Sequence, residues 1–313
     1  MRKKDGNSTP IYILEDMNAS AVVPPREYEA PSWTPLMRAA FTGDIETAKQ
    51  HLDEKNKMNS NGDTALMIAA RMKHEDIVEL LDPTDEDGVT ALMRAAARRN
   101  TEMVELLVPL QKGKQTLGGT MLNDLWIRKG GTALIVGAAH GHAEVVRVLA
   151  EHEGGMKDDF SRTALIHAAE KGHAHCVELL AEKEGGMQDK YGYTALMHTV
   201  RDNRMECVKL LLEKEGNIQD KDGVTALMLA ACNRDPDYVK LLLEKEGGMQ
   251  DNDGWTALMR AVFVGHTESV RLLAEREKDM KTIREWFGYP PGTTALDIAK
   301  ERGHTEIASI LSG

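Results

Sequence analysis

The sequence predicts an all-α solenoid in which about nine helix-turn-helix repeats stack side by side. A unit of 31 residues runs from Asp220 to Gln250, and Asp251 begins the next copy. Four consecutive intervals between equivalent threonines, from Thr132 to Thr256, are each 31 residues long. Self-similarity at such a period is typical of repeat architectures that lack one central core. The threonines that mark the register are Thr34, Thr64, Thr90, Thr132, Thr163, Thr194, Thr225, Thr256 and Thr294.

Each repeat is expected to contain a turn followed by two antiparallel helices. Asp220 and Gly223 favour a turn, because aspartate bonds to its own backbone and glycine accepts a positive φ. Thr225 is a good N-cap for the first helix, and paired alanines in its apolar stripe allow a close approach of neighbouring helices. Asp235 and Pro236 favour the start of the second helix, which ends at a Gly-Gly pair. One flat apolar side of this helix pair must be covered by the next repeat.

These residues resemble the ankyrin repeat family, whose unit reads D-x-x-G-x-T-P-L-H-x-A-A-x-x-G-H-x-x-V-V-x-L-L. Copies in this chain read D-E-D-G-V-T-A-L-M-R-A-A from Asp85 and G-H-A-E-V-V-R-V-L from Gly141. The resemblance covers residues 32–313, with two departures. The period is two residues shorter than 33, and methionine replaces the family's histidine as an apolar plug. The Thr-Ala-Leu-Met motif and the E-K-E-G-G-M connectors, such as residues 182–187, resemble sequences of the diplomonad ankyrin family called protein 21.1.

The resemblance implies a non-catalytic scaffold or adaptor, without a cofactor, that binds other proteins along the concave side of the array. A regulatory protein derived from a family of kinase-ankyrin fusions is the alternative. The chain contains no phosphate-binding loop and no H-E-x-x-H, G-x-S-x-G or C-x-x-C motif, and the repeats leave no room for a catalytic domain. The net charge of −11 disfavours nucleic acid as a partner. We expect a monomeric protein.

The repeats divide the chain into a tail and one repeat domain. Residues 1–31 carry no repeat and are expected to be disordered, whereas residues 32–313 form the array. No secretory signal or membrane span is recognisable, so we expect a cytoplasmic protein. The interval from Thr90 to Thr132 is 42 residues, 11 more than 31, and places an insertion at residues 108–131. We expect this insertion to be functional or a small embedded helix, and to make the junction between the third and fourth repeats the weakest.

A second insertion lies within residues 275–293 and adds seven residues (38 − 31). Trp286, Phe287 and Tyr289 gather in it. These aromatic side chains either anchor a partner protein or fold back on the ninth repeat to cover the end of the array. The sequence leaves both alternatives open.

Histidine and cysteine residues give little evidence for a metal site. Two H-x-H pairs lie one repeat apart, but His142 and His173 occupy the Gly-His position, where the resemblance implies a bond to the loop backbone. Cys176 and Cys207 occupy one helix position in adjacent repeats, which is typical of buried small hydrophobic residues. We therefore expect structural roles for these residues and no metal.

The resemblance places the partner-binding surface on the tips of the turns and on the exposed ends of the first helices. Residues at these positions vary from copy to copy, while the framework repeats. Arginines in the first three repeats and aspartates from the fifth repeat onward form either a polarised groove or an ordinary solvated surface. The candidate partner-binding residues are Trp33, Arg71, Arg94, Arg98, Phe160, Arg162, Tyr191, Tyr193, Arg201, Trp255, Phe263, Trp286, Phe287 and Tyr289.

Overall fold

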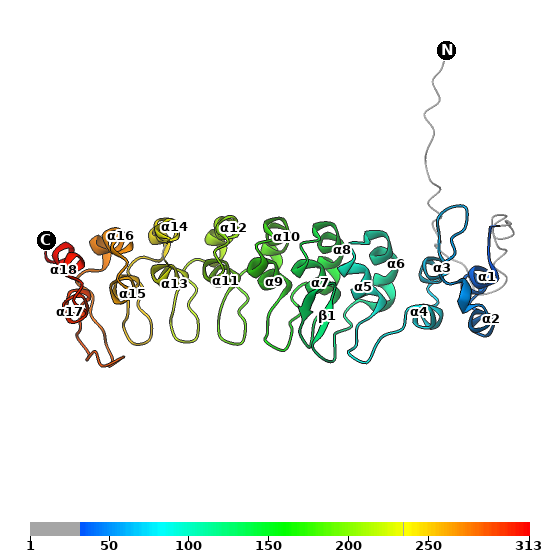
Figure 1. Cartoon of the computed structure of the whole chain (residues 1–313), viewed down its shortest axis with the longest axis horizontal. Coiled ribbons are helices and arrows are strands. Elements are labelled where there is room, and N and C mark those ends of the chain that lie inside the picture. The colour runs from blue at the N-terminus through cyan, green and yellow to red at the C-terminus, as the bar shows by residue number, and fades with distance from the viewer. Residues whose placement is uncertain (1–31, 234) are drawn as a thin grey trace, which may run out of the picture.

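The computed structural model describes residues 32–233 and 235–313, which form a long array of helix pairs (Figure 1). The expected tail, residues 1–31, lies outside the described residues. The first helices of the pairs are α1 (Pro35–Thr42), α3 (Ala65–Arg71), α5 (Ala91–Ala97), α7 (Ala133–Ala139), α9 (Ala164–Lys171), α11 (Ala195–Arg201), α13 (Ala226–Cys232), α15 (Ala257–Val264) and α17 (Ala295–Glu301). The second helices are α2 (Ile45–Gln50), α4 (Glu75–Leu81), α6 (Thr101–Gln111), α8 (Ala143–Glu153), α10 (Ala174–Glu184), α12 (Met205–Glu215), α14 (Pro236–Glu246), α16 (Thr267–Glu277) and α18 (Thr305–Ser312). The predicted all-α solenoid is confirmed.

Every first helix begins directly after one of the register threonines. In eight of these nine helices the threonine hydroxyl accepts a hydrogen bond from the third helical amide, as Thr225 does from Met228 at 3.3 Å. This contact satisfies an amide that has no partner within the helix. Thr163 is the exception, because its buried hydroxyl has no hydrogen-bond partner among the described residues. The predicted register is therefore confirmed.

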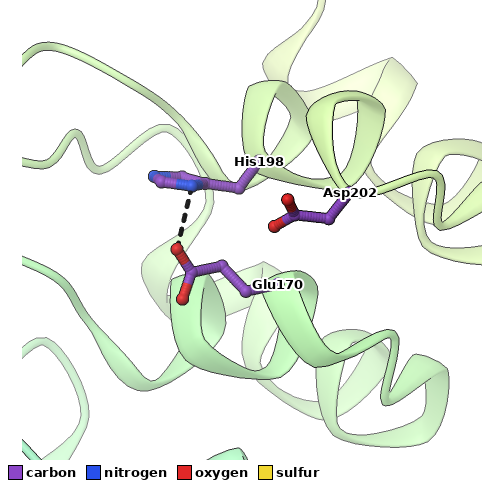
Figure 2. Close-up of side chains that lie close together, drawn as sticks. All are labelled: Glu170, His198 and Asp202. Carbon is purple, nitrogen blue, oxygen red and sulfur yellow. Dashed lines mark ion pairs between the residues drawn. The ribbon is translucent and has the colours of Figure 1, made fainter.

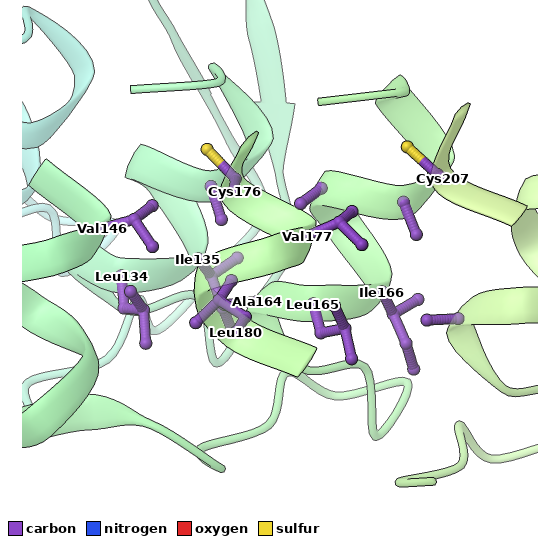
Figure 3. Close-up of a cluster of buried hydrophobic side chains, with 14 of the residues drawn as sticks. Leu134, Ile135, Val146, Ala164, Leu165, Ile166, Cys176, Val177, Leu180 and Cys207 are labelled. Carbon is purple, nitrogen blue, oxygen red and sulfur yellow. The ribbon is translucent and has the colours of Figure 1, made fainter. Parts of the chain in front are cut away.

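The core is a continuous apolar layer between the two rows of helices. Figure 3 shows part of it, including Leu165 and Ile166 of α9. Cys176 and Cys207 are each 1% exposed, and burial raises the pKa of the Cys176 thiol to about 11. Their predicted role as small hydrophobic residues is confirmed. The methionine after the Thr-Ala-Leu or Thr-Pro-Leu motif is buried in five copies, as Met37, Met93, Met197, Met228 and Met259.

The direction of the array reverses between the second and third repeats. From α5 onward each first helix packs against the next first helix, whereas the main contact of α3 with the third repeat is with the second helix α6. In Figure 1, α2 and α4 lie below α1 and α3, but α6 and the later second helices lie above their partners. The connector at residues 82–84 lacks the turn that directly follows α8, α10 and α14, although residues 85–89 form an aspartate turn before α5. The loop before α3 therefore lies on the opposite side of the array from the loops before α11 and α13.

The first insertion contains a β-hairpin, so the expected small embedded helix is wrong. Helix α6 continues to Gln111, and strands β1 (Thr120–Leu122) and β2 (Leu125–Ile127) then pair antiparallel. Asn123 and Asp124 form the turn with φ values of 46° and 63°. Two residues with positive φ give the turn that matches the twist of paired strands. The hairpin buries Leu122 and Ile127, which gives this segment an apolar side without a helix.

This hairpin joins the third and fourth repeats instead of separating them. The Asn123 side-chain amide donates to the Ala97 carbonyl at 2.9 Å, and the ring of His140 lies 3.1 Å from the Leu122 carbonyl oxygen. Helix α5 packs on α7, and α6 packs on α8. The expectation that stacking is interrupted at residues 108–131 is therefore wrong. The interruption lies at residues 82–84.

Candidate partner-binding surface

The turns before α9, α11, α13 and α15 are each built around one aspartate. We call these turns the finger turns; they comprise residues 158–162, 189–193, 220–224 and 251–255. One carboxylate oxygen of this aspartate accepts hydrogen bonds from the amides two and four residues ahead, as Asp189 does from Tyr191 and Tyr193 at 2.8 and 3.0 Å. The same pair of bonds occurs at the other three turns. An aspartate that satisfies two backbone donors fixes the path of its turn. The finger turns therefore present their intervening side chains at fixed positions.

Buried glutamates clamp the first helices to the ends of the second helices. In each case one carboxylate oxygen accepts the amide of the second helical residue at 2.6–2.7 Å, as Glu215 does from Leu196. The other oxygen of Glu215 accepts the Gly186 amide from the preceding connector at 3.0 Å. Sequence reasoning missed this ladder, although its signal is a glutamate that recurs every 31 residues. The ladder consists of Glu153, Glu184, Glu215, Glu246 and Glu277.

Glu170 is the centre of an ion-pair network between α9 and α11 (Figure 2). Its Oε1 atom lies 2.9 Å from Arg162 Nη1 and 3.1 Å from both His198 Nδ1 and Arg201 Nη2. Burial opposes the charge of Glu170, but bonding to His198 and the nearby arginine charge lower its pKa to about 2. His198 Nε2 lies 3.1 Å from Asp189 Oδ2. Although burial disfavours the imidazolium, its two carboxylate partners raise the pKa of His198.

The donor set at the centre of this network fits ion pairs better than a metal. Glu170, His198 and Asp202 place three potential ligand atoms within 4.8 Å of one another. However, Arg162 contacts Glu170, and Arg201 contacts both carboxylates. Two guanidinium groups and an imidazolium already neutralise the three acids around them, including Asp189. A divalent cation would face this positive charge at close range.

The histidines at the Gly-His positions bond to the backbone, as predicted. His142 Nε2 lies 3.1 Å from the Ala97 carbonyl oxygen, and His173 Nε2 lies 3.1 Å from that of Ala139. Burial lowers the pKa of both imidazoles, which favours the neutral form. His140 also contacts backbone carbonyls through both ring nitrogens. The predicted structural role of these histidines is confirmed.

A cavity of about 460 Å³ opens between the finger turns of repeats five, six and seven. It brings together four of the predicted partner-binding residues. Phe160 lies next to it, with its ring centroid 6.5 Å from that of Tyr191 and 3.1 Å from Lys190 Nζ. The sequence also placed Asp222 on this surface, but it did not place Asp189 or Lys221 there. The lining consists of Arg162, Asp189, Tyr191, Tyr193, Arg201, Asp220, Lys221 and Asp222.

The predicted aromatic residues at the C-terminal end form a second cluster. Trp255 is 1% exposed and lies 4.4 Å from Trp286 between ring centroids, and Tyr289 is 5% exposed. Trp255 and Tyr289 are therefore not accessible to a partner in this conformation, whereas Trp286 is half-buried. The aromatic residues of the insertion pack on Trp255 and Phe263 of the eighth repeat, and its Lys281 forms an antiparallel bridge to Thr294 of the ninth repeat. Phe287 remains 73% exposed and keeps the anchor alternative open for that side chain.

The arginines of the first three repeats do not form one open basic edge. Arg94 contacts Asp82 at 2.8 Å and donates to backbone carbonyls of residues 82, 83 and 89, so it holds the short connector. Arg71 pairs with Asp63 at 2.9 Å, whereas Arg98 is exposed. Trp33 packs edge-on against Phe41. Of the two alternatives left open by the sequence, these pairs favour an ordinary solvated surface in this region, because two of the cations are already paired.

The stacked helix pairs, the capping threonines and the finger turns define a helical repeat protein whose surface loops recur at a fixed interval. A family model described as ankyrin repeats (3 copies) matches residues 15–84, 81–158, 152–222, 214–284 and 249–313. The chain therefore belongs to the ankyrin repeat family. No helix among the described residues is long and apolar enough to cross a lipid bilayer.

The chain is similar to a solved ankyrin repeat structure. The crystal structure of the ankyrin repeat domain of Bcl-3, described as a unique member of the IkappaB protein family, is 27% identical with a TM-score of 0.59. The match covers 73% of this chain and 100% of that one. Comparison with curated protein sequences gives no match.

Proposed function

We propose that this chain is a non-catalytic protein-interaction scaffold that binds partners through the finger turns of repeats five to seven. The observation that carries the proposal is the cavity between these turns, where Arg162, Tyr191, Tyr193 and Arg201 meet. Tyrosine and arginine are enriched among residues that dominate binding energy in protein interfaces. The finger aspartates and the glutamate ladder fix the backbone around these side chains, which lowers the entropy cost of binding.

We also propose a subfamily, a cellular location and an oligomeric state for this scaffold. The Thr-Ala-Leu-Met style is similar to the protein 21.1 family, and we extend the proposal to a cytoplasmic, monomeric scaffold of that kind. Sedimentation equilibrium checks the oligomeric state, since a monomer has a mass of 34.6 kDa. No observation on the described residues favours the alternative of a regulatory protein derived from a kinase fusion.

Affinity capture with matched variants tests the proposed surface. The full chain is compared with a triple variant, Phe160→Ala, Tyr191→Ala and Tyr193→Ala. Leu210→Ala is the control, because Leu210 is 39% exposed on α12, away from the finger turns. We expect the triple variant to lose proteins that the wild type and the control both retain, with unchanged helical circular dichroism. Equal recovery by all three baits contradicts the proposal.

A further inference from the structure

One finger aspartate lacks the arginine or histidine partner that its counterparts possess. Aspartates lie five residues before the register threonine in five repeats, and the residue four after that threonine is arginine or histidine in four of them. The pairs are Asp85 with Arg94 (3.7 Å), Asp158 with His167 (3.0 Å), Asp189 with His198 (3.1 Å) and Asp251 with Arg260 (2.6 Å). In repeat seven the aspartate is Asp220 and the corresponding residue is Leu229, which is apolar.

No other cation of the described residues replaces the missing one. Asp220 Oδ1 accepts the amides of Asp222 and Val224, as its counterparts do, but no ion pair to Asp220 is present in the part of the chain that the structure describes. Lys221 Nζ, the nearest lysine in the sequence, donates to the Lys190 carbonyl at 2.6 Å. Burial raises the pKa of Asp220, although its two turn amides and the charge of Arg260 oppose this shift.

The cavity around Asp220 has the chemistry of a pocket for a basic side chain. Of its three cations, Arg162 and Arg201 are already paired with Glu170, and Lys221 donates to the Lys190 carbonyl. Tyr191, which is 54% exposed, and the half-buried Tyr193 supply aromatic surface. Aromatic rings attract cations, and a planar guanidinium group can stack on a ring while it bonds to a carboxylate. A carboxylate without a cation beside two tyrosines therefore matches arginine.

We infer that this cavity binds an arginine side chain from an extended segment of a partner protein, with Asp220 as the counter-charge and Tyr191 and Tyr193 as the aromatic walls. The inference rests on the proposed function and specifies the chemistry of its partner. The partner's arginine takes the place that Arg260 occupies beside Asp251 in the next repeat.

Titration of the isotope-labelled full chain with a defined peptide tests this inference. The probe is acetylated Gly-Ser-Arg-Ser-Gly amide, and its control is the same peptide with citrulline, which has the shape of arginine without its charge. We expect saturable amide shifts in residues 189–193 and 220–224 with the arginine peptide. Binding of the citrulline peptide should be about tenfold weaker or absent. Equal binding of both peptides, or no binding of the arginine peptide, overturns the inference.

Variants of the same repeat separate a pocket from a general surface effect. Leu229→Arg supplies the internal cation found in repeat eight and should abolish binding of the arginine peptide. Leu229→Met keeps an apolar side chain of similar volume and should bind within about twofold of the wild type. Asp220→Asn retains an oxygen that can accept the turn amides but removes the charge, and it should also abolish binding. Wild-type binding by Leu229→Arg or by Asp220→Asn overturns the inference.

Failure of the arginine-binding inference can be distinguished from failure of the proposed function. If the arginine peptide does not bind but capture still depends on Phe160 and Tyr191, the inference fails and the scaffold proposal stands. If capture is insensitive to those residues, the proposed function fails.

Discussion

The backbone amide of Leu196 donates a hydrogen bond of 2.6 Å to Glu215 Oε2 at the other end of the same repeat. The second oxygen of Glu215 accepts the Gly186 amide of the preceding connector. One buried side chain thus satisfies backbone donors of two adjacent repeats. Because the contact recurs through the array, it fixes the spacing of the finger turns that form the proposed surface.

Removal of Glu215 is expected to destabilise the array strongly. Glu215→Ala leaves two buried amides without acceptors, and each unsatisfied group costs about 1–3 kcal/mol. Glu215→Gln keeps one acceptor oxygen and should cost less. Urea unfolding followed by circular dichroism measures both. The control is Glu213→Ala on the same helix, where Glu213 is 81% exposed, and its effect should stay below about 0.5 kcal/mol. Equal midpoints for Glu213→Ala and Glu215→Ala would contradict the clamp.

The charge network around Glu170 predicts a pH dependence of stability. The folded-state pKa of Glu170 is about 2, below the ordinary value of 4.5. The folded state therefore holds fewer protons than the unfolded state between these values, and the contribution of Glu170 is complete above pH 4.5 and lost as pH falls toward 2. Glu170→Gln should lower stability at neutral pH by at most about 3 kcal/mol.

Thermal unfolding between pH 7 and 2 measures this contribution. The midpoint difference between wild type and Glu170→Gln should shrink as pH falls from 4.5 to 2. The exposed Glu178 on α10 provides a control substitution to glutamine with little effect throughout. If the difference in thermal midpoint between wild type and Glu170→Gln does not change with pH, the charge network does not contribute to stability as described.

The capping threonines predict a difference between two repeats. Thr225 accepts the Met228 amide, so Thr225→Ala should cost about 0.5–2 kcal/mol. The Thr163 hydroxyl makes no capping bond, so Thr163→Ala should cost less. Cys232→Ser, at an exposed position at the end of α13, should also cost less than Thr225→Ala. Urea midpoints in the reverse order would show that the caps do not control helix stability.

The reversed packing predicts where the array opens first. Residues 83–87 are exposed and lie at the junction where α3 packs against α6. Limited digestion with a nonspecific protease, followed by mass spectrometry, should give a first cut within residues 82–87. The hydrogen-bonded hairpin at residues 120–127 should resist cleavage at that stage. A first cut within residues 140–260 would show that the weakest junction lies elsewhere.

The periodic part of the fold was predictable because each repeat carries its own local signals. The register threonines locate the helix starts, and the positions of Cys176 and Cys207 correctly predicted burial. The glutamate ladder was missed because a charged residue near a Gly-Gly pair normally indicates a solvated helix end. Its burial depends on an amide 19 residues before each glutamate and on a second amide, which lies 29 residues before four of them and 40 residues before Glu153.

The irregular parts were not predictable from period alone. The shortened connector at residues 82–84 could be recognised in the sequence. However, α3 packs against α6 instead of α5, and this depends on packing between helices that the period does not predict. Trp255 was expected at the surface because a repeat pattern treats every finger turn alike, whereas both an exposed and a covered position were left open for Tyr289. The two rings lie against each other because the second insertion, which has no counterpart in the other repeats, packs on Trp255.

Hydrogen exchange of the full chain with and without a captured partner tests the central claim most directly. We expect slower exchange on binding in residues 158–162, 189–193 and 220–224, because the partner covers the finger turns of repeats five to seven. The amides of α10, α12 and α14 should be unchanged. Protection confined to those second helices, or to the first two repeats, would contradict the proposed binding surface.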